Sequence, residues 1–138
     1  MNPKFNIKPN HAVHLLQGLV AVNEAQLKEH IKDRGNPFTI IEAIQNGNLR
    51  YKRSDPEEHW QSYNELVELT KNKLSGTDKE VGADCEDLAA AVVAELKHAG
   101  IDARIYVYKA RTGLYHVIVK TKKWGFLDPS LSAGMGTV

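Results

Sequence analysis

The chain has 138 residues, 42% of them hydrophobic, and a single cysteine, so it is long enough for one domain with its own core and cannot form an intrachain disulfide. Its 18 basic and 17 acidic residues give a net charge of +1, which provides no reason to expect nucleic-acid binding. Residues 1–10 lack a signal-peptide pattern and no apolar run approaches the roughly 18 residues needed to span a bilayer, so we expect a cytoplasmic protein that does not bind membranes.

The first half of the chain shows helical spacing of apolar residues in three stretches. The first covers residues 11–32 and the second residues 38–44, and each is followed by glycine or proline stop signals. The pair Asp55–Pro56 predicts the N-cap and the first residue of a third helix. The apolar side of this third helix is expected to contain Trp60, Tyr63, Leu66, Val67, Leu69 and Leu74. A polar loop over residues 75–80 follows.

The second half of the chain predicts one helix followed by a small sheet. The helix begins near Cys85 and ends in the segment His98–Gly100, where the glycine suits a C-terminal cap. Residues 103–109, 114–120 and 123–127 are rich in β-branched and aromatic residues and are separated by short turns, which is typical of three antiparallel strands.

The order of these elements predicts an α+β fold. A boundary near residues 75–81 would leave two parts that are each small for independent stability, so we expect a single domain over residues 1–138. Its helical part spans residues 1–75, and its later helix and sheet span residues 81–130. The tail, residues 131–138, is weakly apolar, and we expect it to be flexible or docked on the surface.

The only cysteine lies in an acidic run at the expected start of the second-half helix. If Asp84 is the N-cap, Cys85 is the first helical residue and Asp87 the third, where its carboxylate can return a hydrogen bond to the cap. The positive end of the helix dipole favours a thiolate, but the carboxylates of Asp84, Glu86 and Asp87 oppose it. We expect these carboxylates to point to water, so that a nearby imidazolium can outweigh them and activate the thiol.

His116 is the best placed of the six histidines to be that partner. It lies among apolar residues of the second expected strand, and Asp128 ends the third. A hairpin that turns near Lys122 would bring Asp128 back toward the level of His116, where its carboxylate can hold one ring nitrogen. The order cysteine, histidine, aspartate suits a thiol nucleophile, because the histidine takes its proton and the aspartate orients the histidine.

The segments Gly82–Asp87, Tyr115–Val117 and Trp124–Pro129 together resemble the transglutaminase-like branch of the papain-like cysteine peptidases. The resemblance covers about residues 55–130 and implies a papain/transglutaminase-like fold, with N-terminal helices and a nucleophile-bearing helix packed on a small antiparallel sheet. One departure is that the glycine that usually precedes Asp-Cys directly is replaced by Ala83, with a glycine one place earlier.

The resemblance also implies roles for individual residues. Cys85 would be the nucleophile, His116 the general base and then the general acid, and Asp128 the residue that orients His116. We expect no cofactor and no catalytic metal. Some bacterial members of the family bind calcium through acidic residues beside the cysteine, so calcium near Asp84 and Glu86 stays open.

An acyl-transfer site also needs hydrogen-bond donors for the developing oxyanion. The backbone N–H of Cys85 is one candidate, and the resemblance points to an upstream donor, for which Trp60 Nε1 and the Gln61 amide are the candidates. Trp60 also fits the apolar stripe of its expected helix, so a core position is the alternative for it.

The expected function is a cysteine protease or amidase that cleaves an amide, peptide or isopeptide bond through an acyl-enzyme on Cys85. Two alternatives remain: a protein-crosslinking acyl transferase, and a non-catalytic assembly or interaction module on the same scaffold. The expected partner is a protein or peptide substrate. Membership of a larger assembly stays open.

Overall fold

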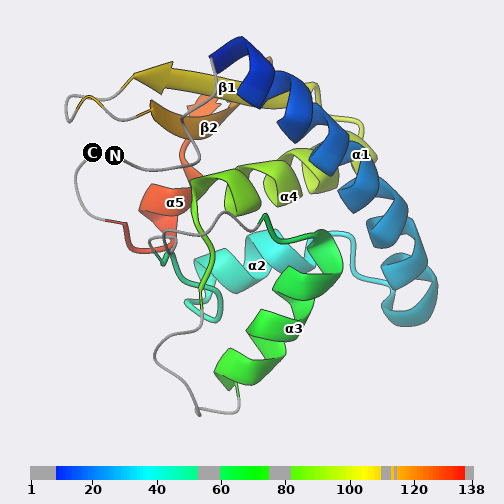
Figure 1. Ribbon diagram of the computed structural model, residues 1–138. Coiled ribbons are helices and arrows are strands. Elements are labelled where there is room, and N and C mark those ends of the chain that lie inside the picture. Colours follow the sequence, from blue (N-terminus) through cyan, green and yellow to red (C-terminus); the bar gives the residue numbers. More distant parts are fainter. Residues whose placement is uncertain (1–8, 53–59, 75–81, 110–112, 114, 136–138) are drawn as a thin grey trace.

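A computed structural model describes residues 9–52, 60–74, 82–109, 113 and 115–135 of the chain (Figure 1). Within these residues the order of elements is as follows: α1 (Pro9–Arg34), α2 (Thr39–Gln45), α3 (Tyr63–Leu74), α4 (Cys85–His98), β1 (Ala103–Lys109), β2 (Tyr115–Thr121), β3 (Gly125–Leu127) and α5 (Pro129–Ser132). The strands form an antiparallel sheet in the order β1-β2-β3. The fold is therefore α+β, as the order of elements in the sequence predicts.

The first strand is confirmed to the residue. The second-half helix begins at Cys85 and ends at His98, within the bounds expected for it, and α1 and α2 lie where helical spacing predicts them. The third helix is the main correction, because α3 begins at Tyr63 and Trp60 precedes it. The physical reason is capping by another helix: Tyr63 N–H donates to Asn23 Oδ1 (2.8 Å) and Asn64 N–H donates to Gln26 Oε1 (2.9 Å), both on α1. The pair Asp55–Pro56, expected to start this helix, lies outside the described residues.

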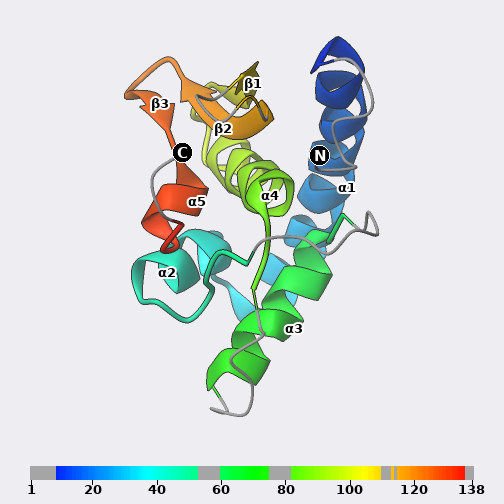
Figure 2. The same cartoon turned by 60° about the vertical axis from the view of Figure 1, so that its left-hand side comes forward.

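Helix α4 is the centre of the molecule. It passes between the sheet and the helices α2 and α3, and α1 runs along one side of it (Figures 1 and 2). All of its residues from Cys85 to Leu96 are buried. The run Ala89–Ala91 explains how so many neighbours can approach, because alanine favours the helix and its small side chain allows close packing.

The two faces of the sheet differ in character. The face toward α4 carries Ile105, Val117 and Val119, which belong to the core. The alternate residues form the outer face, on which the register places Tyr108 opposite His116 and Arg104 opposite Lys120. The sheet therefore contributes one face to the core, whereas the other carries exposed polar and aromatic side chains together with the buried His116 and Ile118.

Glu95 is a completely buried residue of α4, and its carboxylate joins this helix to α2 and α3. Its Oε2 accepts hydrogen bonds from the backbone N–H of Ile40 and the hydroxyl of Tyr63, both at 2.7 Å, and its Oε1 accepts from the N–H of Ile41 at 2.8 Å. The N-cap residue Phe38 gives α2 no side-chain cap, so Glu95 supplies the acceptor. Burial is the main cause that raises the pKa of Glu95 to about 7.

The tail is partly ordered by packing. Residues 129–132 form α5, Ala133 is buried, and the N–H of Tyr51 donates to the carbonyl of Ala133 at 2.9 Å. The tail from residue 131 is therefore docked through Ala133 rather than flexible there, and residues 136–138 lie outside the described residues.

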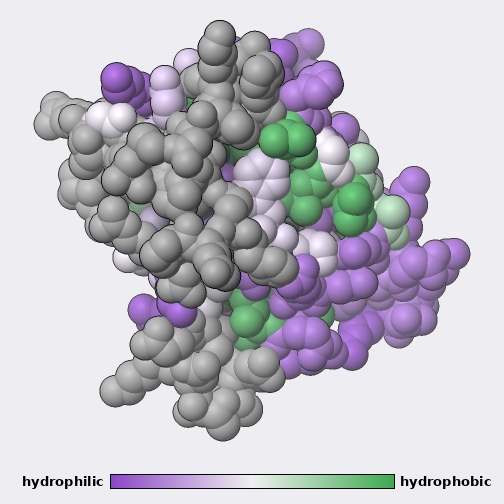
Figure 3. All heavy atoms as spheres, in the orientation of Figure 1, coloured by the Kyte–Doolittle hydropathy of each residue, from purple (hydrophilic) through white to green (hydrophobic). Residues whose placement is uncertain are grey.

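Apolar side chains also reach the surface on α1. Figure 3 shows hydrophobic atoms gathered over this helix, where Leu15 and Val22 are about half exposed (54% and 48%). Among the described helices, none is long and apolar enough to cross a membrane.

Replacing Glu95 by glutamine should destabilise the protein. An amide cannot accept all three hydrogen bonds, and its NH2 group would face a backbone N–H of α2, so we expect the free energy of unfolding to fall by about 1–3 kcal/mol. Urea unfolding would measure this. The control Glu68→Gln breaks an exposed ion pair with Lys71 and should cost less than about 0.5 kcal/mol. Equal effects of the two changes would contradict the role given to Glu95.

Candidate functional site

A short backbone bridge leads into the helix that carries Cys85. The N–H of Ala83 donates to the carbonyl of Arg50 (3.0 Å), and the N–H of Lys52 donates to the carbonyl of Ala83 (2.9 Å). A Cβ at Gly82 would lie 2.6 Å from Lys52 Cβ and 2.7 Å from the carbonyl oxygen of Arg50, so a glycine is required there. The glycine at position 82 thus has a structural reason of its own.

The first turn of α4 is closed by the expected capping box. Asp84 is the N-cap, and its Oδ1 accepts from the N–H of Asp87 at 3.3 Å. In return, Asp87 Oδ2 accepts from the N–H of Asp84 at 3.3 Å. Cys85 is therefore the first helical residue and is 6% exposed, at the positive end of the helix dipole.

The acidic residues around Cys85 do not point to water, which corrects the expectation from the sequence. Asp84, Glu86 and Asp87 are all buried. Asp87 also accepts hydrogen bonds from Gln61, one from the backbone N–H to Oδ1 (2.7 Å) and one from Nε2 to Oδ2 (3.2 Å). Burial, followed by the charge of Asp84, raises the pKa of Asp87 to about 8. The raised pKa favours the protonated form of Asp87, which carries less negative charge beside the thiol.

His116 and Asp128 form a hydrogen-bonded pair. His116 Nε2 lies 3.0 Å from Asp128 Oδ2, and the histidine is only 4% exposed. The meander brings them together, as the expected hairpin predicts, because Asp128 follows β3 directly. Asp128 is also the N-cap of α5, and its Oδ1 accepts from the N–H of Leu131 at 3.2 Å. One carboxylate oxygen thus holds the histidine while the other holds the helix.

Tyr108 packs against the histidine of this pair. Its ring meets the His116 ring edge-on, with centroids 5.7 Å apart and an interplanar angle of 90°. Burial and then the charges of Asp128 and Cys85 raise the pKa of Tyr108, so both groups lie within electrostatic range of its hydroxyl. The sequence pattern indicates only a packed or half-exposed strand residue here. Its position opposite His116 in the register is the signal that could identify it.

The two candidate oxyanion donors differ in their surroundings. Gln61 Nε2 donates to the carbonyl of Gly82 (3.3 Å) and to Asp87 (3.2 Å), so both of its amide hydrogens have acceptors. Trp60 Nε1 is buried and has no hydrogen-bond acceptor among the described residues. A buried donor without an acceptor costs free energy, and such donors deserve a functional explanation. Trp60 is therefore the better candidate of the two.

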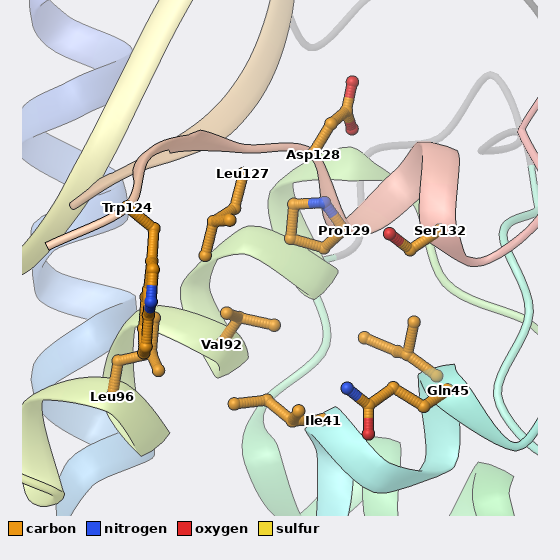
Figure 4. A pocket seen from close by; sticks show the side chains of 10 residues that line it. Ile41, Gln45, Val92, Leu96, Trp124, Leu127, Asp128, Pro129 and Ser132 are labelled. Carbon is orange, nitrogen blue, oxygen red and sulfur yellow. The ribbon is translucent and has the colours of Figure 1, made fainter.

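An apolar pocket of about 310 Å³ lies beside the junction between β3 and α5 (Figure 4). Its lining consists of Ile41, Ile44, Gln45, Val92, Leu96, Trp124, Leu127, Asp128, Pro129 and Ser132. Figure 4 shows that the carboxylate of Asp128 points away from the other lining side chains. The pocket therefore shares Asp128 with the His116–Asp128 pair, but the carboxylate of Asp128 points away from the rest of the lining.

The acidic first turn does not form a metal cluster in the part of the chain that the structure describes. Within that part, no group of three or more His, Cys, Asp or Glu side chains is arranged to hold a metal ion. The two residues considered for calcium, Asp84 and Glu86, are both buried. Asp84 uses Oδ1 as the helix cap.

Comparison with known proteins gives no assignment. No protein-family model matches the chain. No curated protein matches it, and no solved structure does. Any functional conclusion must therefore come from the chemistry of the site itself.

The raised pKa of Asp87 predicts how stability depends on pH. The folded state keeps a proton that an unfolded aspartate releases above about pH 4, so the free energy of unfolding should fall as the pH rises from about 5 to about 8. Glu95 acts in the same direction up to about pH 7. Asp87→Asn should reduce the slope, measured by urea unfolding at several pH values.

The control for this experiment is Asp33→Asn, which changes an exposed aspartate in α1 and should keep the slope of the original protein. If the slope of Asp87→Asn equals that of the control, Asp87 does not hold a proton in the folded state.

Proposed function

We propose that the chain is a thiol acyl-transfer enzyme with a transglutaminase-like, papain-like fold, and that it hydrolyses an amide, peptide or isopeptide bond. Cys85 is the nucleophile, His116 the general base and then the acid, and Asp128 the orienting residue. The observation that carries the proposal is the 3.0 Å bond between His116 and Asp128, beside a tyrosine whose hydroxyl is within electrostatic range of the Cys85 thiol.

The bond to Asp128 decides which nitrogen of His116 does the chemistry. Because Nε2 faces the carboxylate, we assign the ring hydrogen to Nε2, whose N–H donates a hydrogen bond to Asp128, and Nδ1 is left as the basic nitrogen. Nδ1 then takes the proton of the Cys85 thiol as the sulfur attacks the carbonyl carbon of the substrate. The same nitrogen returns this proton to the leaving amine, and a water molecule later releases the acyl group.

The surroundings of Cys85 support the thiolate and the transition state. The helix dipole favours the thiolate, and the proton held by Asp87 removes part of the opposing negative charge. For the oxyanion, the proposed donors are the backbone N–H of Cys85 and the indole of Trp60. Gln61 has a different task, because it holds Asp87 and therefore the first turn of α4.

Two other functions remain compatible with the same residues. A crosslinking transferase would form the same acyl-enzyme but release it to a lysine amine instead of water. Mass spectrometry of a model glutamine peptide incubated with an amine separates the two, since transfer incorporates the amine with loss of ammonia and proteolysis cleaves the peptide. A non-catalytic module would keep its biological role in the variant Cys85→Ala.

Alkylation of Cys85 by iodoacetamide tests the thiolate directly. We expect the rate at neutral pH to exceed that of free cysteine and to fall by about tenfold or more in His116→Ala, because the imidazole is the proton acceptor. Mass spectrometry of the intact protein measures the rate, and the single cysteine makes the readout unambiguous.

The matched control for this labelling is His98→Ala, which removes an exposed histidine at the other end of α4. It should leave the alkylation rate unchanged. A rate no faster than that of free cysteine, or one that does not depend on His116, would sink the enzyme proposal.

Trp60→Phe separates oxyanion stabilisation from thiolate formation. Acylation of Cys85 by p-nitrophenyl acetate passes through an oxyanion, so loss of the indole N–H should slow it by about 10²–10³-fold. Alkylation by iodoacetamide has no oxyanion and should keep its rate. The control Trp124→Phe, at an exposed tryptophan, should change neither rate. If Trp60→Phe acylates normally, the indole is only a core group.

A further inference from the structure

An aromatic strip on the outer face of the sheet leads to His116. It consists of Phe126, Tyr106 and Tyr108. The Phe126 and Tyr106 rings meet edge-on with centroids 4.9 Å apart, and those of Tyr106 and Tyr108 lie 6.3 Å apart. Tyr108 then contacts His116. Phe126 is 55% exposed and Tyr106 39% exposed, so the strip is open to solvent at the end away from His116.

The strip lies in the most basic part of the chain. Residues 103–127 include six Lys or Arg residues and no Asp or Glu, although the chain as a whole has a net charge of only +1. Arg104 and Lys120 are exposed and directly opposite each other in the register, on the same face as the strip. Like charges in such a pair destabilise a sheet, and a negatively charged partner would relieve the repulsion.

We propose that this face binds the substrate, and that the substrate is an extended acidic peptide segment with apolar side chains. The inference rests on the proposed function, since it names the substrate class of the same site. The strip would pack against the apolar side chains, and Arg104 with Lys120 would bind the carboxylates. Tyr108, in contact with His116, connects the bound segment to the reacting groups.

The arrangement of the rings favours a peptide over a nucleic acid. Base stacking requires aromatic faces presented flat to solvent. Here the rings of Tyr106 and Phe126 are turned against each other at 61°, and Lys120 Nζ lies over the Phe126 ring, 5.7 Å from its centroid. Rings tilted against each other offer few flat faces to bases, whereas aliphatic side chains can pack against ring edges as well as faces.

The charges also give the bound segment a direction. Asp128 is negative and lies at the His116 end, so an acidic side chain next to the reacting bond would be repelled. Arg104 and Lys120 lie four residues along their strands from Tyr108 and His116, which corresponds to roughly 13 Å. An extended peptide advances at a similar rate per residue, so the preferred acidic residue lies about four positions from the reacting bond.

Fluorescence anisotropy with the full chain carrying Cys85→Ala tests the proposal without turnover. The probes are a short labelled peptide of glutamate and leucine, the same peptide with lysine in place of glutamate, and oligothymidine. We expect the acidic peptide to bind at least about tenfold more tightly than the basic one. Phe126→Ala should weaken its binding by about fivefold or more.

Arg104→Glu separates binding from folding. Glutamate opposite Lys120 converts a repulsive cross-strand pair into an attractive one, so the thermal midpoint should not fall, whereas affinity for the acidic peptide should fall by about fivefold or more. The controls Lys28→Glu and Leu15→Ala change exposed residues of α1 and should leave affinity unchanged.

Equal binding of the acidic and basic peptides, or full affinity in Arg104→Glu and Phe126→Ala, would overturn the proposal. Preferred binding of oligothymidine through the same residues would overturn it as well. Because the binding assay uses a chain without the thiol, its failure leaves the labelling of Cys85 untouched. Slow labelling of Cys85 would remove the proposed chemistry but not a measured affinity.

Discussion

The site depends on the burial of helix α4 from its first turn onward. A helix that begins inside a protein must find partners there for its first N–H groups and for every charge it carries. In α4 the capping box of Asp84 and Asp87 satisfies the first turn, and Gln61 completes the bonding of Asp87. Further along, Glu95 holds the start of α2 and the hydroxyl of Tyr63. The buried carboxylates therefore determine which segments can approach the helix, and so where Cys85 lies.

The same burial changes the electrostatics of the thiol. Three ionised carboxylates next to Cys85 would oppose a thiolate strongly, since little solvent is present to screen them. Burial instead favours the protonated form of Asp87, and its backbone and side-chain hydrogen bonds remain. The groups that fix the helix therefore contribute less negative charge than their number suggests. In the mechanism that we propose, His116 accepts the proton of the thiol against a smaller opposing field.

Local signals in the sequence were sufficient to predict the elements whose hydrogen bonds are formed by residues close to them in sequence. The capping box, Gly100 after α4 and the strand pattern predict α4, the meander and the approach of Asp128 to His116. The start of α3 and the surroundings of Trp60 were not predictable, because side chains of α1 cap α3. The burial of the acidic run also depends on neighbours distant in sequence, with segment 50–52 on one side and Gln61 on another.

Backbone hydrogen bonds link the segment before Cys85 to the helix that Asp128 caps. Asp128 caps α5, the end of α5 bonds to Tyr51 through the carbonyl of Ala133, and the segment around Tyr51 pairs with Ala83, two residues before Cys85. Segment 50–52 thus connects the start of α4, which carries Cys85, to α5, whose N-cap is Asp128. The bonds of segment 50–52 to Ala133 and Ala83 are between backbone groups, so side-chain changes within this segment leave the connection in place. A side chain at Gly82 would not, because its Cβ would force segment 50–52 away. Gly82 is therefore part of the same backbone connection between the segment before Cys85 and α5.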